Sequence, residues 1–144
     1  MSDTTFDVEA IAAAESRVLV FRDGASIYRR HERGDCAYII RAGQVEINER
    51  GRAVEVMQPG EIFGEMALID REARTASAVA VGEVEVIPID RPLFQVLIRD
   101  DPDFALTIIH LLARRLRAAM NLLERQTGER PPARREATGS RATA

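Results

Sequence analysis

Between residues 17 and 89 the sequence consists of short apolar runs that end at turn residues, and this pattern limits the fold more than any other feature. The runs are RVLVF, SIY, AYII, VEI, AVEVM, TASAVAV and VEVIPI, and the turns among them contain DG, RGD, AGQ, ERG and QPG. Short β-branched or aromatic runs predict strands, and the alternation in VEINE and AVEVM predicts strands with one solvent-facing side. About eight strands in about 75 residues predict an antiparallel jelly-roll barrel, which protects its sheet edges by closing.

Helical patterns flank this β region. Residues 6–14, FDVEAIAAA, have a helix-forming composition. The apolar edge of this short helix is predicted to consist of Phe6, Val8 and Ile11. Farther along, Asp90 and Pro92 are typical of the first residues of a helix. The buried stripe of this second helix is predicted to consist of Leu93, Phe94, Leu97 and Ile98. The fold class is therefore mainly β with flanking helices.

A longer helix is predicted to begin near Asp101 and Pro102. Apolar residues recur along it at alternating spacings of four and three, which is the period of a coiled-coil seam. The seam consists of Ala105, Ile109, Leu112, Leu116, Ala119 and Leu123, and it is widened by Ile108, Leu111 and Leu122. One edge of the helix is expected to cover the barrel, and the rest is wide enough to form a homodimer with a second copy. Gly128, Pro131 and Pro132 are expected to end the helix.

The chain has 144 residues, of which 46% are apolar and 30% charged, and this suits a single globular domain with a real core. We predict one domain over residues 1–126, with the barrel at 17–89 and the C-terminal helices at 90–126. Residues 127–144 have the composition of a disordered tail. A solvated basic face explains the arginines near the end of the chain better than nucleic-acid binding does.

No apolar run approaches the roughly 18 residues that cross a bilayer, and the start of the chain lacks the features of a signal peptide. We therefore expect a cytoplasmic protein that is not bound to a membrane. Cys36 is the only cysteine, so it cannot close an internal disulfide, and its expected role is that of a small core side chain. The sequence has no cluster of His and Cys residues that would predict a metal site. We also expect neither catalytic residues nor a cofactor.

The stretch GEIFGEMALIDREARTASAV, residues 60–79, places Glu65 and Arg74 in an apolar context. Gly64 leads into EMALI, which favours a single helical turn whose first amides attract anions. A guanidinium at Arg74 would match phosphate oxygens, and a carboxylate at Glu65 would accept hydrogen bonds from sugar hydroxyls. The alternative is structural: Glu65 and Arg74 pair with each other, or Arg74 pairs with Asp70.

The segment FGEMALIDREARTASAVA closely resembles the phosphate-binding cassette of cyclic nucleotide-binding domains, which reads roughly FGE-[LM]-A-L followed by R-[STA]-A. The spacing from Glu65 to Arg74 matches the form found in protein kinase A regulatory subunits. The segment GASIYRRHERGDCAYIIRAGQVEI also resembles the first strands of the family, and the likeness covers about residues 17–126. The resemblance implies a stand-alone bacterial form of a catabolite activator protein-like effector domain that lacks the DNA-binding domain.

The resemblance also implies roles for individual residues. Glu65 would accept the ribose 2′-hydroxyl, and Arg74 would bind the cyclic phosphate. Backbone groups of Gly64 and Ala67 would approach the ligand, Met66 would face the sugar or the base, and the Thr75 hydroxyl would reach the phosphate. The ligand is expected to be cAMP or cGMP, because a hydroxyl at the Thr75 position occurs with both preferences.

On the long helix, HLLARRLRAAMNLLE resembles the dimerising helix of the catabolite activator protein. The likeness would let Arg115 reach back toward Glu65 or the ribose, and Asn121 is a second possible contact of this lid. The hydroxyl residues that contact adenine in that protein fall here on Ala119 and Met120, so the base contact differs from the family pattern. His31 stands where the family usually has a glycine, which we interpret as a local change of the loop.

The main hypothesis is a cyclic nucleotide sensor that passes ligand binding through its C-terminal helix to a dimer mate or to a protein partner. Two alternatives are a ligand-independent interaction module with the same fold and a fragment of a transcription regulator. Because no helix-turn-helix follows the long helix, sequence-specific DNA binding is not expected. A cupin enzyme or a haem sensor would need clustered ligands, and the two histidines, His31 and His110, lie on unlike elements.

Overall fold

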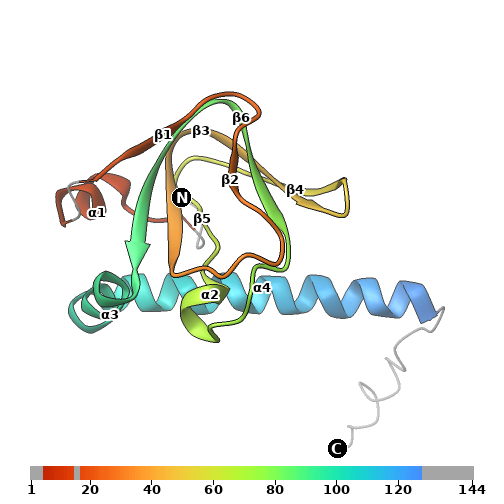
Figure 1. Ribbon diagram of the computed structural model, residues 1–144. Coiled ribbons are helices and arrows are strands. Elements are labelled where there is room, and N and C mark those ends of the chain that lie inside the picture. The colour runs from red at the N-terminus through yellow and green to blue at the C-terminus, as the bar shows by residue number, and fades with distance from the viewer. Residues whose placement is uncertain (1–4, 15–16, 128–144) are drawn as a thin grey trace, which may run out of the picture. The chain divides into compact units, whose positions relative to one another are not determined.

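The computed structural model describes residues 5–14 and 17–127. Its helices are α1 (Val8–Ala14), α2 (Met66–Ile69), α3 (Arg91–Asp100) and α4 (Pro102–Thr127). Its strands are β1 (Leu19–Phe21), β2 (Ser26–Tyr28), β3 (Cys36–Glu49), β4 (Arg52–Met57), β5 (Ile62–Phe63) and β6 (Ser77–Asp90). The expected fold class, a mainly antiparallel β domain with a short N-terminal and a long C-terminal helix, is confirmed (Figure 1).

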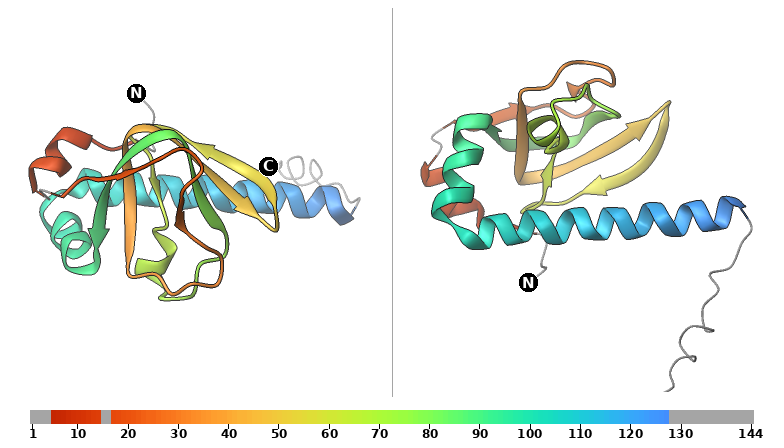
Figure 2. Two further views of the ribbon diagram at one scale, coloured as in Figure 1. Left: turned by 45° about the horizontal axis from the view of Figure 1, so that its top comes forward. Right: turned by 90° about the horizontal axis from the view of Figure 1, so that it is seen from below.

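The strands form one antiparallel sheet in the order β1-β6-β3-β4, with β2 also on β6 and β5 also on β3. The sheet curls around a core but does not close, because β1 and β4 remain at the two ends of this order. The hairpin of β3 and β4 projects from one side of the sheet in both views of Figure 2. The apolar cluster inside the sheet consists of Ile40, Val45, Met57, Phe63, Ala78, Ala80, Val84 and Val86.

The described residues contain six strands, so the expectation of about eight is wrong. Two expected breaks, at Gly43 and Gly82, lie inside the 14-residue strands β3 and β6. Both glycines have positive φ, 86° and 71°, and the pairing register of β3 with β6 shifts on either side of Ala42. A glycine in this conformation makes a bulge that bends a strand without ending it, so pairs of predicted strands merge.

Helix α3 begins where the sequence predicts, and α1 begins at Val8, two residues after the start of the predicted range 6–14. The Asp7 carboxylate accepts a hydrogen bond from the Ala10 amide at 3.2 Å, and the Asp90 carboxylate accepts one from the Leu93 amide at 3.0 Å. Such caps satisfy amides that have no partner within the helix. The rings of Phe6 and Phe104 lie 5.0 Å apart between centroids, which joins the start of the chain to the start of α4.

The buried side of α3 is narrower than predicted. Phe94 and Leu97 are buried, Leu93 is half-buried, and Ile98 is 39% exposed. Ile98 follows Leu97 by one residue, which turns its side chain about 100° around the helix. The expectation that Ile98 belongs to the buried stripe is therefore wrong.

The described residues up to Thr107 form one compact unit, and those from Ile108 form a second, with the boundary inside the continuous 26-residue helix α4. On the second unit, the predicted seam residues Ile109, Leu116 and Leu123 are 59%, 62% and 60% exposed. The single-domain assignment of residues 1–126 remains a prediction. The predicted helix stop at Gly128 and the tail that follows lie outside the described residues.

Candidate functional site

The segment that follows β5 forms the turn that the glycine at position 64 predicts. Gly64 has φ 78°, and Glu65 then takes the N-cap position directly before the four-residue helix α2. The Glu65 carbonyl accepts hydrogen bonds from the amides of Leu68 at 3.0 Å and Ile69 at 3.2 Å. A Cβ atom on Gly64 would lie 2.7 Å from Nη1 of Arg74, so the turn requires glycine for its conformation and for the space that Arg74 occupies.

Arg74 lies in the chain between α2 and β6, and its side chain is only 7% exposed. Its Nη1 donates to the carbonyl oxygen of Gly64 at 2.9 Å, and its Nη2 donates to that of Cys36 at 2.7 Å. The guanidinium carbon lies 3.9 Å from the centroid of the Tyr28 ring, within the range of a cation–π contact. Arg74 is thus fixed by β2, β3 and the α2 turn together.

The backbone of Arg74 is also anchored. Its amide donates to the Glu32 carbonyl at 2.8 Å, and its carbonyl accepts from the His31 amide at 2.8 Å. His31 has φ 77°, in the left-handed region that favours glycine. His31 thus has a backbone conformation that glycine would adopt more readily, and the predicted local change of this loop stays a prediction.

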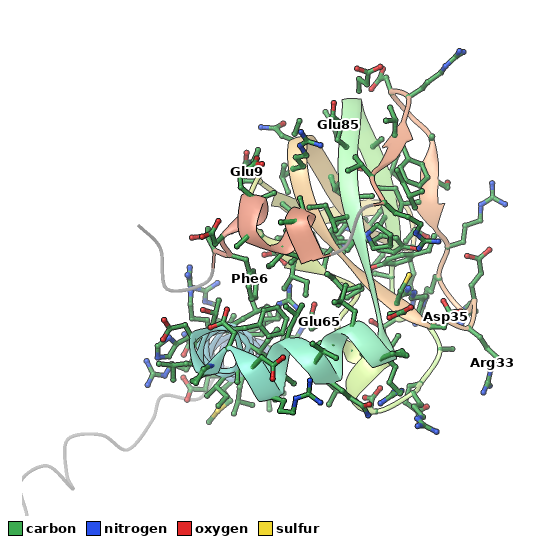
Figure 3. All side chains as sticks on the ribbon, turned by 90° about the vertical axis from the view of Figure 1, so that its left-hand side faces the viewer. Phe6, Glu9, Arg33, Asp35, Glu65 and Glu85 are labelled. Carbon is green, nitrogen blue, oxygen red and sulfur yellow. The ribbon has the colours of Figure 1, made fainter. Side chains whose placement is uncertain are left out.

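Glu65 is fully buried, with an exposed fraction of 0%, and Figure 3 labels it within the body of the domain. Its side chain does not cap α2 although it holds the N-cap position. A buried carboxylate costs desolvation free energy, so its presence at this turn calls for a function or a specific interaction.

The structural alternative predicts a pairing of Arg74 with Glu65 or with Asp70, but the contacts described for the Arg74 side chain are of another kind. The side-chain hydrogen bonds of Arg74 go to two backbone carbonyls, and its ring contact goes to Tyr28. A guanidinium has five N–H donors, and these bonds use two of them. Three donors remain for an anion that approaches the turn.

The other residues that are predicted to contact the ligand lie either near the Gly64 turn and Arg74 or on α4. Ala67 is buried in α2, whereas Met66 is 44% exposed and Thr75 is exposed beside Arg74 in the chain. Arg115 and Asn121 lie on α4 in the second unit, so their contact with the ligand stays a prediction.

Sequence reasoning missed three residues that position Arg74. Tyr28 supplies its ring, Cys36 supplies a carbonyl, and Gly34 leaves the space, because a Cβ there would lie 2.4 Å from Cζ of Arg74. The expected role of Cys36 as a core side chain is wrong, since the residue is only half-buried and acts through its backbone. No local pattern could reveal these contacts, because they join residues that are far apart in the chain.

The thiol of Cys36 and the hydroxyl of Tyr38 form a hydrogen bond next to this turn. Burial raises the pKa of the Cys36 thiol, and the hydrogen bond to Tyr38 lowers it by less. Burial, together with the hydrogen bond to Cys36, raises the pKa of Tyr38. Both groups are therefore neutral near pH 7 and leave the positive charge of Arg74 in place.

Within residues 5–14 and 17–127, no three His, Cys, Asp or Glu side chains gather in a way that could hold a metal ion. Among the same residues, no helix is long and apolar enough to span a membrane.

Comparison with known proteins identifies relatives of this chain in sequence and in fold. The family model described as a cyclic nucleotide-binding domain matches residues 18–101. The CRP-like cAMP-activated global transcriptional regulator of Mycobacterium tuberculosis is 36% identical over 121 residues, which cover 79% of this chain and 54% of that protein. The cGMP-dependent protein kinase of Caenorhabditis elegans is 38% identical over 84 residues, or 54% of this chain and 11% of the kinase.

The crystal structure of the catabolite activator protein of Thermus thermophilus has the same fold, with a TM-score of 0.75 at 33% sequence identity. The likeness covers 83% of this chain and 58% of that one. The chain thus spans about half the length of the bacterial regulators that it matches.

Proposed function

This chain belongs to the cyclic nucleotide-binding domain family, and we propose that it is a regulatory module that senses a cyclic nucleotide, cAMP or cGMP. The observation that carries the proposal is the buried guanidinium of Arg74, which two carbonyls and an aromatic ring hold beside the Gly64 turn. Carbonyls orient a cation without neutralising it. An anionic ligand would complete the charge, and a cyclic phosphate supplies one negative charge on two free oxygens.

In the proposed complex, Arg74 binds the cyclic phosphate and the Glu65 carboxylate accepts the ribose 2′-hydroxyl. Backbone groups of Gly64 and Ala67 approach the ligand, and the exposed Thr75 hydroxyl is free to rotate toward the phosphate. Met66 covers the sugar or the base. Arg115 and Asn121 of α4 act as the lid. We expect no metal ion or further cofactor.

The test is an isothermal titration of ligand-stripped protein with cAMP and with cGMP in parallel. We expect at least one nucleotide to bind with a micromolar or lower Kd, and the ratio of the two affinities to identify the base. Arg74→Ala should weaken binding by about 100-fold, because it removes charge-assisted hydrogen bonds to the phosphate. Arg74→Lys keeps the charge but loses the planar fork, so its affinity should lie between those of the native chain and of Arg74→Ala.

Arg22→Ala is the matched control, because Arg22 is an exposed arginine near the β1–β2 turn. Urea unfolding of each variant separates lost binding from lost folding. If Arg74→Ala bound as tightly as the native chain, the proposal would be abandoned. If the native chain bound neither nucleotide, the alternative of a ligand-independent interaction module would replace it.

The proposed output is a change in α4 that reaches a dimer mate or a protein partner. The exposed seam of Ile109, Leu116 and Leu123 supports a homodimer, because three large apolar side chains on one helical edge favour pairing. Light scattering should give twice the mass of 16.0 kDa for the native chain. Leu116→Glu should give the single mass, whereas Ala118→Glu, on another side of the same helix, should not. A native chain that stays at the single mass with and without nucleotide would contradict the dimer.

A second candidate function is the effector region of a longer transcription regulator. The observation that favours it is the coverage of the Mycobacterium tuberculosis relative, of which this chain matches 54%. Sequencing the transcript that encodes the chain distinguishes the two, because a regulator would continue into a DNA-binding region. We propose the cytoplasm as the site of action in either case.

A further inference from the structure

A pocket of about 390 Å³ lies beside α2 and is lined by arginines that the nucleotide site does not use. Arg33 and Asp35 line it from the loop before β3, Arg71 follows α2, and Arg91 begins α3. Figure 3 shows Arg33 and Asp35 at the outer end of their loop. We call this site the arginine pocket. Glu65, Arg74 and Thr75 do not line it.

The arginine pocket carries a net positive charge, because three guanidinium groups face one carboxylate. Arg91 is held in place, since its Nη2 donates to the carbonyl oxygen of Leu68. Within the described residues, the side chains of Arg33 and Arg71 form no hydrogen bond and no ion pair. Two guanidinium groups beside one concave surface therefore have all their donors available for a ligand.

Arg71 occupies a backbone position that does not suit it. It has φ 61° directly after the Asp70 cap of α2, where helices most often place glycine. A residue with a Cβ atom is strained in this region. The chain thus has an arginine in the lining of the arginine pocket at a backbone conformation that glycine would adopt more readily.

We propose that the arginine pocket binds a second small ligand that carries a phosphate or diphosphate group. Guanidinium forks match phosphate oxygens, and the volume lies within the range of small-molecule sites. The buried side chains of Ala67 and Leu68 form an apolar floor for the rest of the ligand, and Asp35 can accept hydrogen bonds from its hydroxyl groups.

The arginine pocket also shares structure with the nucleotide site. Ala67 belongs to both, and Gly34, on the pocket wall, leaves the space that the Arg74 guanidinium fills. A ligand in the arginine pocket therefore regulates nucleotide affinity through α2 and the loop at Gly34. This regulation rests on the proposed function, whereas binding of the second ligand does not.

The experiment uses the full chain, free of nucleotide, and titrates it with inorganic pyrophosphate at constant ionic strength while amide chemical shifts are recorded by NMR. We expect saturable shifts in residues 33–35 and 67–72. Arg71→Gly should raise the Kd for pyrophosphate by about five- to tenfold, because one charged donor is lost. This variant should fold at least as well as the native chain, since its φ suits glycine.

Arg50→Gly is the matched control. Arg50 is an exposed arginine with φ 54° in the β3–β4 turn, so the variant removes the same charge from the same backbone conformation away from the arginine pocket. It should leave pyrophosphate binding within about twofold of the native value, because distant exposed charges are largely screened by salt.

Three results would overturn the proposal. One is the absence of saturable shifts in the native chain up to millimolar pyrophosphate. Another is an equal effect of Arg71→Gly and Arg50→Gly, which would indicate non-specific charge attraction. The third is the loss of pyrophosphate binding in Arg74→Ala, which would place pyrophosphate in the nucleotide site. None of these depends on whether cAMP or cGMP binds.

Discussion

Replacing Gly34 by alanine tests the packing around Arg74 with the addition of a single methyl group. The new Cβ atom would lie 2.4 Å from Cζ and from Nε of Arg74, whereas ordinary contacts begin at 3.4 Å. The guanidinium must therefore move by about 1 Å, the difference between these two distances. It is buried and held by bonds of 2.7 Å and 2.9 Å, so this movement breaks at least one of them.

The expected cost follows from the bonds that are lost. A hydrogen bond to a charged group contributes about 1.5–3 kcal/mol, and a desolvated cation–π contact contributes about 2 kcal/mol. Loss of one bond, with part of the ring contact, predicts that Gly34→Ala lowers the free energy of unfolding by about 2–4 kcal/mol. Nucleotide affinity should fall as well, because the guanidinium no longer points along its native direction.

Urea unfolding of four proteins measures this cost in a double-mutant cycle: the native chain, Gly34→Ala, Arg74→Ala and the double variant. If the clash is the cause, Gly34→Ala should cost less than about 0.5 kcal/mol once Arg74 is alanine, since the space is then empty. An equal cost in both backgrounds would refute the reasoning, because the loss would then come from the loop alone. A cost near zero in the native background would refute it too.

Three further predictions concern other contacts near the site. Tyr28→Leu should lower the free energy of unfolding by about 1–2 kcal/mol by removing the ring over Arg74, and Tyr28→Phe should lose less, as measured by urea unfolding. Asp90→Ala should lower the free energy of unfolding by about 1 kcal/mol through loss of the α3 cap. Asp90→Asn should retain most of the stability that the cap contributes, as measured in the same assay. Because burial raises the pKa of Cys36 and of Tyr38, the folded chain keeps protons that the unfolded chain releases. Stability should therefore be full below pH 9.0, the ordinary thiol value, and fall as pH rises, and Cys36→Ala should make this fall smaller in urea midpoints measured from pH 7 to pH 10.5.

The sequence predicts most of the fold because the fold depends on local signals. The cap at Asp90 and the helix-forming composition of residues 6–14 act over a few residues, and the structure confirms them. The error at Gly43 and Gly82 has a physical cause. Glycine accommodates both a turn and a bulge, and pairing of β3 with β6 over their full length decides between them.

The site is only partly predictable, because some of its contacts join residues that are far apart in the chain. Glu65 and Arg74 stand out as charges in an apolar segment, and the structure buries both. The residues that position Arg74 give no such signal, because Tyr28 and Cys36 meet it only after the sheet has formed. Arg71, with its positive φ, is also hidden in the sequence, since an arginine after a short helix reads as an ordinary solvated residue.

The bonds of Arg74 link the stability of the fold to the proposed function. A guanidinium that is 7% exposed has lost most of its water, and in the described structure carbonyl oxygens rather than a carboxylate replace that water. Carbonyl dipoles offset only part of the desolvation cost of a full charge, so the domain without ligand retains an unfavourable contribution at this point. A bound phosphate would offset it, so we expect the proposed nucleotide to stabilise the fold. At 100 times its Kd a ligand stabilises the folded state by about 2.7 kcal/mol, and in this domain we expect that gain to require the Arg74 side chain.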